Sequence, residues 1–167
     1  MALRLNDDVV PASDDDDSKS ELARLKRLLG EGLPMERQAA LLRLVELGAE
    51  GTLVECLASD NLLAAQLATA GLWECWLNEE GPKARREIDK GIRCMNGREW
   101  EDALAIFGKL VVKYPDWAEA HNKQATVFYL MGNARHSLRL CEVVVRLKPH
   151  HFGAWNGMAL CAAQLEK

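Results

Sequence analysis

The stretch AEAHNKQATVFYLMGNARHSLRLCEVVVRLKP, residues 118–149, decides the fold because its pattern recurs along the chain. Pro115 recurs as Pro149, and the same step takes His121 to Trp155, in an unfinished third unit. The step also pairs small residues with small ones and apolar residues with apolar ones: Gly91 with Ala125, Ala103 with Ser137, Phe107 with Cys141, and Leu110 with Val144. A period of this length, about 34 residues, predicts pairs of antiparallel helices that must stack to bury their apolar faces.

Each unit closes at a proline, which stops the second helix because it lacks an N–H and disfavours helix before it. Small residues at the eighth and twentieth positions of a unit let the two helix backbones approach closely. This pattern resembles the tetratricopeptide repeat, which implies an all-α, right-handed solenoid that serves as a protein-binding scaffold. The resemblance covers residues 84–117, residues 118–151 and the first helix of a third unit.

Helical patterns also precede the repeats. Apolar stripes predict a helix after Ser20, a second after Pro34, a short third around residues 53–57, and a fourth that Asp60 or Asn61 caps. The helices between Met35 and Gly81 resemble a short HEAT-type hairpin. We therefore expect the following domains: a disordered acidic leader over 1–20, a HEAT-like helical region over 21–81, and the repeat region over 82–167.

The acidic run Asp14 to Asp17 is the reason for expecting a leader, since like charges repel and no apolar residue accompanies them. A divalent-ion site or a tail for a basic partner is the alternative, although the run lacks the Gly and the distal Glu of a calcium loop. The first residues, with Asp7 and Asp8, resemble neither a secretory signal nor a transit peptide.

Composition narrows the function classes. The 167 residues carry a net charge of −4, so we expect no general affinity for nucleic acid or anionic membrane. No apolar run approaches the roughly 20 residues that span a bilayer. Five scattered cysteines without a CxxC pair indicate buried thiols in a reducing compartment rather than a zinc or redox site. We expect no cofactor.

The segments LWECW (72–76) and HFGAWNGMALC (151–161) are similar to those of a group of tetratricopeptide proteins from bacteria, plants and algae. Many of the plant and algal members are plastid-targeted. The resemblance thus implies a plastid (chloroplast) stroma if a transit peptide is missing from this start, and the cytoplasm otherwise. In that group the third unit normally continues through a complete helical pair, whereas here it stops at Lys167.

The resemblance also implies a binding groove, because the first helices of such units line a concave face. An extended or helical peptide could bind there through side-chain amides and aliphatic contacts. The alternative for Ile88, Ile92 and Leu130 is packing on neighbouring helices. The residues expected to face the groove are Arg85, Ile88, Asp89, Ile92, Met95, Asn96, Glu119, Asn122, Lys123, Thr126, Tyr129, Leu130, Asn156, Leu160 and Gln164.

Members of the superfamily that bind chaperone C-termini hold the terminal carboxylate with Lys and Asn side chains. Only Lys123 could donate to a carboxylate at those positions, which argues against a chaperone co-factor role of that type. The residues at those positions are Ile88, Ile92, Lys123, Gly153 and Gly157.

The aromatic residues suggest one contact outside the groove. Trp117 follows Pro115 in an interhelical turn, so we predict a partner contact there, with packing across the repeat junction as the alternative. Trp155 and His121 fill an aromatic slot of the motif, where we expect them to be buried.

Catalysis has little support, since the chain has no Gly-x-Ser-x-Gly elbow, phosphate loop or HExxH. Two functions remain: a non-enzymatic scaffold or adaptor that binds a peptide or subunit in the groove and helps to assemble a complex, and a fixed structural subunit of a multiprotein complex. The unfinished third unit favours the subunit, because an exposed apolar helix edge needs a partner or a cap.

Overall fold

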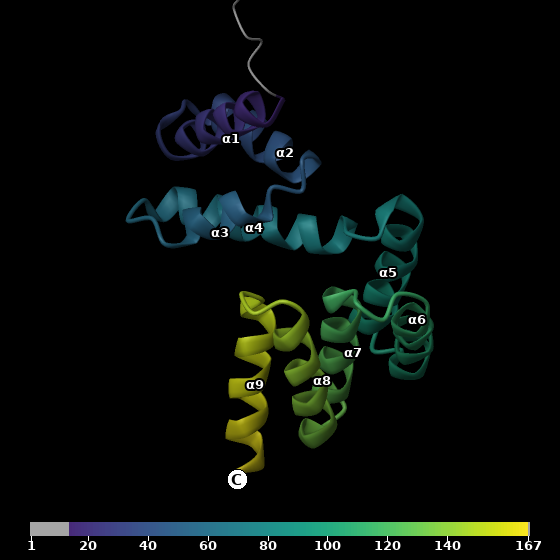
Figure 1. The fold of residues 1–167 in the computed structure, drawn as a ribbon. Helices are drawn as coiled ribbons and strands as arrows, with labels where there is room; N and C mark the ends of the chain where they lie inside the picture. The colour runs from purple at the N-terminus through teal and green to yellow at the C-terminus, as the bar shows by residue number, and fades with distance from the viewer. Residues whose placement is uncertain (1–13, 167) are drawn as a thin grey trace, which may run out of the picture. The chain divides into compact units, whose positions relative to one another are not determined.

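The computed structural model describes residues 14–166, and helices occupy most of this part of the chain (Figure 1). The nine helices within it pack as sequential neighbours, so the expected all-α fold of stacked helices is confirmed. Their bounds are α1 (Asp14–Glu31), α2 (Pro34–Glu46), α3 (Glu50–Leu57), α4 (Leu62–Asn78), α5 (Gly81–Asn96), α6 (Trp100–Lys113), α7 (Ala118–Leu130), α8 (Ala134–Leu147) and α9 (Phe152–Leu165).

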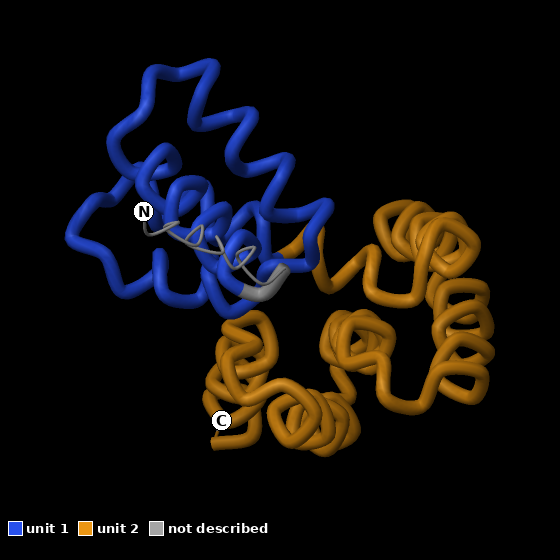
Figure 2. Tube along the Cα trace, turned by 45° about the horizontal axis from the view of Figure 1, so that its top comes forward, with its two compact units in different colours: residues 1–72 blue, residues 73–167 orange. Residues whose placement is uncertain are grey.

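The chain divides into two compact units, residues 1–72 and residues 73–167 (Figure 2). The sequence suggests a boundary after residue 81, in the turn that follows α4. The structure instead divides the chain within α4, because Trp73 and Trp76 of this helix pack against residues of the repeats.

The first unit contains α1, α2, α3 and the start of α4. Its core consists of leucines from successive helices, and Gly71 allows α4 to approach them closely. A Cβ atom at Gly71 would lie 2.7 Å from Leu41 Cδ1 and 3.1 Å from Leu53 Cδ1. At the start of α2 the Glu36 carboxylate accepts a hydrogen bond of 2.7 Å from the Leu33 N–H.

Helix α1 begins earlier than the sequence indicates. The structure includes residues 14–20 in this helix, where the sequence predicts a disordered leader. Carboxylates in the first turn of a helix are favoured by the unpaired N–H groups and the helix dipole, which accounts for an acidic start. Residues 1–13, which include Asp7 and Asp8, lie outside the described residues.

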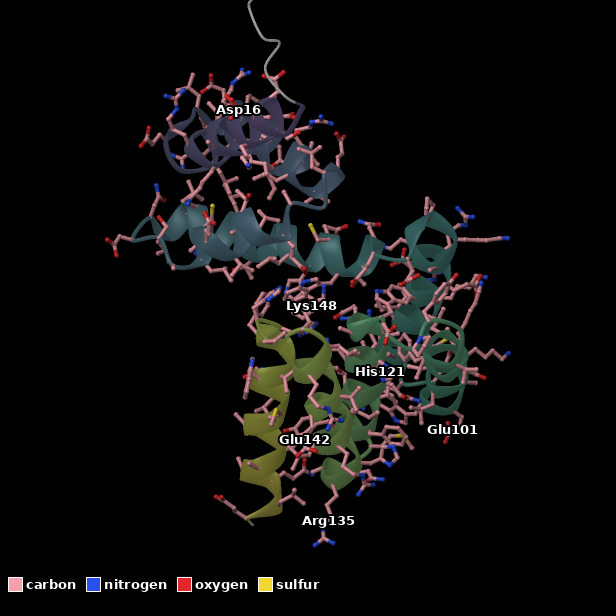
Figure 3. All side chains as sticks on the ribbon, viewed as in Figure 1. Asp16, Glu101, His121, Arg135, Glu142 and Lys148 are labelled. Carbon is pink, nitrogen blue, oxygen red and sulfur yellow. The ribbon has the colours of Figure 1, made fainter. Side chains whose placement is uncertain are left out.

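The second compact unit, residues 73–167, contains the repeats. Helices α5 and α6 form the first pair, α7 and α8 the second, and α9 the first helix of the third. The sequence pattern predicts the first pair over about residues 82–96 and 100–114, and the structure agrees to within one residue at each end. Helix α6 starts at Trp100, and Glu101 extends from its first turn (Figure 3).

Close packing within the first pair depends on Gly91. A Cβ atom at this position would lie 2.4 Å from Phe107 Cε1, well inside van der Waals contact. One unit later, Ala125 and Cys141 hold the equivalent positions and belong to one buried cluster. Between the two repeats, the glycine position gains a larger residue (Ala125) and the phenylalanine position gains a smaller one (Cys141). The two contact residues thus change in opposite directions, as interdigitating helices require.

The turn inside each pair needs one residue in the left-handed conformation. The repeat pattern predicts the turn at Gly97, and the structure has it at Gly97 and Arg98. The left-handed residue is Arg98, with a φ of 62°, whereas Gly97 has a φ of −78°. The equivalent residue of the second unit is Gly132, whose φ is 82°. Arg98 thus occupies a backbone position that glycine tolerates best.

Candidate partner-binding site

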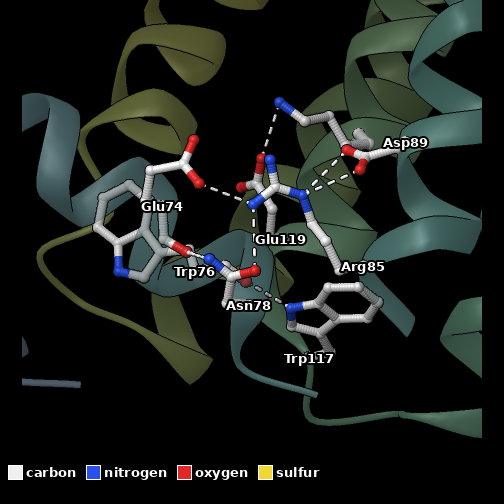
Figure 4. Close-up of polar contacts among 8 residues, drawn as sticks. Glu74, Trp76, Asn78, Arg85, Asp89, Trp117 and Glu119 are labelled. Carbon is white, nitrogen blue, oxygen red and sulfur yellow. Dashed lines mark hydrogen bonds and ion pairs between the residues drawn. The ribbon is translucent and has the colours of Figure 1, made fainter. Parts of the chain in front are cut away.

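Trp76, near the end of α4, is hydrogen-bonded to the start of α7 (Figure 4) and also contacts the start of α9. Trp117, the N-cap residue of α7, donates a hydrogen bond of 2.7 Å from Nε1 to the Trp76 carbonyl. His151, the N-cap residue of α9, stacks on the Trp76 ring with centroids 4.1 Å apart and an interplanar angle of 19°. Because one repeat period separates Trp117 from His151, equivalent residues of successive units hold the same tryptophan.

Glu119, in the first turn of α7, lies at the centre of a buried polar cluster. Its side chain is fully buried, and Oε2 lies 2.9 Å from His151 Nε2. Asn122 Nδ2 donates to the same oxygen at 3.0 Å, and Lys123 Nζ lies 2.7 Å from Oε1. A buried carboxylate is stable only with such partners, so these four side chains form one structural group.

The hydrogen bonds of His151 determine its tautomer. Nδ1 accepts the Ala154 N–H at 3.1 Å and caps α9, so Nδ1 carries no proton in this arrangement. Nε2 therefore carries the proton and donates to Glu119. With a neutral imidazole, the single charge of Glu119 is balanced by Lys123.

The first two repeats carry ion pairs at equivalent positions, with the order of acid and base reversed. In α5, Arg85 Nε lies 3.0 Å from Asp89 Oδ1; in α7, the matching residues are the acid Glu119 and the base Lys123. Arg85 is also held from α4, since its Nη1 donates to Glu74 Oε2 at 2.7 Å (Figure 4). In each unit the pair is i,i+4 on one helix.

These contacts fill the part of the predicted groove near the helix N-termini. Glu119 and Ile88 are fully buried, and Asn122 is 6% exposed. Ile92 and Met95 pack on the core of the first repeat, to which Ile88 belongs. The alternative given for Ile88 and Ile92, packing on neighbouring helices, therefore agrees with the structure. Several groove residues named from the sequence are thus engaged inside the chain: Arg85 and Asp89 with each other, Lys123 with Glu119, and Thr126 with the Asn122 carbonyl.

The part of the predicted groove near the C-terminal ends of α7 and α9 is open. A depression of about 510 Å³ lies there between the two helices. Leu130 is 51% exposed and Leu160 is 43% exposed. The depression is lined by four residues that the sequence assigns to the groove, Tyr129, Leu130, Leu160 and Gln164, together with Gly132 and Ala163. Asn96 and Asn156 are exposed outside it.

Two tryptophans differ from expectation. Trp117 is fully buried, so the structure agrees with packing at the junction rather than with the partner contact predicted there. Trp155 is 52% exposed, not buried as expected, because its Nε1 donates to the Pro149 carbonyl at 2.7 Å and holds the ring over a surface turn. His121 makes the equivalent bond to Pro115 at 2.8 Å and is 8% exposed.

Sequence reasoning missed the roles of Trp73, Trp76 and His151. From the sequence, the LWECW segment indicates only a family resemblance, and His151 has no assigned role. The interval from Trp117 to His151 was the available signal, since it equals the repeat period. Nothing in the sequence indicated that both would contact α4.

The comparisons with known proteins agree with the helical pairs. The chain is 42% identical over 57 residues to a TPR repeat-containing protein of Rhizobium etli, and the match covers 34% of this chain. It spans 28% of the length of that relative. No family model and no solved structure match the chain. Over part of its length, therefore, the chain is a distant homologue of a tetratricopeptide-repeat protein, which confirms the resemblance read from the sequence.

No helix between residues 14 and 166 is long and apolar enough to cross a membrane. Within the same range, His, Cys, Asp and Glu side chains form no group of three or more that could hold a metal ion.

Proposed function

We propose that the chain is a non-enzymatic scaffold whose protein partner binds in the open depression between α7 and α9. The observation that carries this proposal is the contrast along the groove. Near the helix N-termini the side chains are committed to the Glu119 cluster, whereas Tyr129, Leu130 and Leu160 line an accessible, partly apolar hollow. Repeats of this class usually mediate protein binding, which supports the same function.

The lining indicates the chemistry of the bound segment. Leu130 and Leu160 offer aliphatic surface, and the Tyr129 hydroxyl and the Gln164 amide offer hydrogen bonds at the rim. An aliphatic or aromatic side chain of a peptide would enter the depression, and the polar groups would bind the peptide backbone. Lys123 is not available to such a segment, because Glu119 and the Trp73 ring hold its ammonium group.

The test is affinity capture of the full chain from its native cells, with partners identified by mass spectrometry. We expect a defined partner to be lost with the double variant Tyr129→Ala, Leu160→Ser. The control is Leu62→Ser, at a 72% exposed leucine in the compact unit of residues 1–72, and it should keep the partner. Recovery of the same partner with all three proteins would contradict binding in the depression.

A fixed structural subunit is the second candidate, and one observation favours it. Ala159 is exposed in α9, whereas Gly91 and Ala125, its equivalents in α5 and α7, are buried. Helix α9 contains no charged residue and also exposes Leu165. In such a complex a helix from another subunit would cover this face. Substitution Ala159→Arg should then release the chain from a large complex in native lysate, as measured by size-exclusion chromatography.

The location and the process are finer proposals that rest on the sequence resemblance. A plastid stroma or the cytoplasm, and a part in assembling a larger complex, follow from that resemblance alone. Imaging of the tagged full-length protein in its native cells tests the location directly.

A further inference from the structure

A cavity of about 280 Å³ lies between α5 and α6 and shares no residue with the depression between α7 and α9. Its floor is apolar, since Ala84 and Leu110 are 2% and 5% exposed and Ile106 is half-buried. The other residues that line it are polar: Lys83, Glu87, Lys109, Lys113 and Tyr114.

The charge of this lining is positive. Glu87 is its one carboxylate: Lys90 Nζ lies 2.7 Å from Glu87 Oε1, and Lys109 and Lys113 also interact with this carboxylate at longer range. The hydrogen bond from Lys90 is also the main cause of the lowered pKa of Glu87. Lys113 Nζ lies 4.8 Å from the centre of the Tyr114 ring. Among residues 14–166, no carboxylate forms an ion pair with any of the three lysines of the lining.

The next unit carries different residues at the same positions. A step of one repeat period replaces Lys83 by Trp117 and Lys109 by Val143. Trp117 is fully buried in the junction between units, whereas Lys83 is exposed on the outer side of the first pair. A polar outer face suits the first unit of a stack. Solubility is served by balanced charges of mixed sign, however, whereas this edge gathers three lysines against one carboxylate in a chain with a net charge of −4.

We propose that this cavity binds a protein partner through an acidic peptide segment that carries one apolar side chain. The volume suits a single large side chain on the floor formed by Ala84 and Leu110. The lysines at the rim would form charge-assisted hydrogen bonds with flanking carboxylates. An anionic membrane is the less suitable partner, since Val112 is the one large hydrophobic residue of α5 and α6 among those markedly exposed, and surface insertion requires a broad apolar face.

The probes are fluorescein-labelled peptides of sequence Asp-Glu-Leu-Glu-Asp and Asp-Glu-Phe-Glu-Asp, titrated with the full chain by fluorescence anisotropy. We expect saturable binding that weakens as salt rises from 50 to 300 mM, because added salt screens the attraction between the lysines and the carboxylates. Peptides with Ser at the centre, or with Lys in place of the acids, should bind at least tenfold more weakly.

Two double variants with equal changes of net charge test the site. Lys109→Glu with Lys113→Glu should weaken binding at least tenfold, while Arg135→Glu with Arg139→Glu, on exposed residues of α8, should change it less than twofold. An equal loss with both variants, or no saturable binding of either acidic peptide, would overturn the proposal. So would lysine-dependent sedimentation with phosphatidylserine vesicles in the absence of peptide binding, which would assign the surface to a membrane.

Discussion

The imidazole of His151 donates to the carboxylate of Glu119 across 2.9 Å, and neither side chain is exposed to solvent. The two residues belong to successive units, so the bond links α7 to the N-terminal end of α9. Asn122 and Lys123 complete the partners of the carboxylate. This cluster is therefore a structural element, and its removal should reduce stability rather than binding alone.

Substitution Glu119→Ala should lower the free energy of unfolding by about 3 kcal/mol, because it leaves Lys123 and His151 without their buried partner. Glu119→Gln keeps an acceptor for His151 and should cost less. The measurement is urea unfolding of the full chain followed by tryptophan fluorescence. Glu142→Ala, at an exposed site on α8, is the control and should change stability by less than about 0.5 kcal/mol. Similar values for the two alanine variants would show that the cluster contributes nothing.

Gly91→Ala should destabilise the protein by about 1–3 kcal/mol, since the new methyl group would overlap the Phe107 ring. The same substitution should cost less in a Phe107→Leu background, where the smaller side chain leaves room. Urea unfolding of the four proteins gives a double-mutant cycle, with an expected coupling of about 0.5–3 kcal/mol. Additive effects would mean that Phe107 is not the source of the cost.

Arg98 and Gly132 should respond in opposite directions to exchange of their residue types. Arg98→Gly removes a left-handed penalty of about 1–2 kcal/mol, partly offset by the greater freedom of glycine in the unfolded chain. We expect it to raise the midpoint of thermal unfolding, and we expect Gly132→Arg to lower it. Arg93→Gly, within α5, serves as the control and should destabilise by about 1 kcal/mol.

Burial raises the pKa of the Cys141 thiol to about 11. In the unfolded chain the thiol ionises near pH 9, so above that pH the unfolded state loses a proton that the native state keeps. The stabilising effect of this thiol is thus complete below pH 9 and is lost as pH rises toward 11. Stability measured from pH 8 to 11 should fall less steeply in Cys141→Ala than in the native sequence.

Cysteine labelling gives an independent reading of the same environment. At pH 8.5 the native Cys141 thiolate should be about 100-fold scarcer than that of an ordinary cysteine, at tenfold per pKa unit. Iodoacetamide should modify Cys141 only after unfolding, as followed by peptide mass spectrometry. Rapid modification of the folded protein at this residue would contradict its burial.

The repeat architecture could be predicted because it is local. The step from Gly91 to Ala125 and the proline at each unit end report contacts between helices adjacent in the chain, and the helix bounds of the first pair agree closely. The turn at Gly97 also follows from the sequence, although the left-handed residue within it is Arg98.

The candidate site could be predicted only in part. Its residues were assigned by position in the motif, and four of them line the open depression. The Glu119 cluster was missed because its cover comes from outside the motif. Trp76 and Trp117 are 41 residues apart, and no periodic pattern connects them. The opposite charges at Arg85 and Glu119 are visible in the sequence, but position in the motif assigns their i,i+4 partners, Asp89 and Lys123, to the groove.

The contact between Trp76 and the N-caps of α7 and α9 changes where a minimal fragment of this protein can begin. By periodicity the repeats start at Ala84, and an expression boundary chosen on that basis would remove Trp73 and Trp76. It would uncover the His151 ring and delete the carbonyl that Trp117 binds. The smallest piece that preserves the folded array therefore includes the end of α4, and crystallographic or NMR work on the repeats alone should start upstream of Trp73.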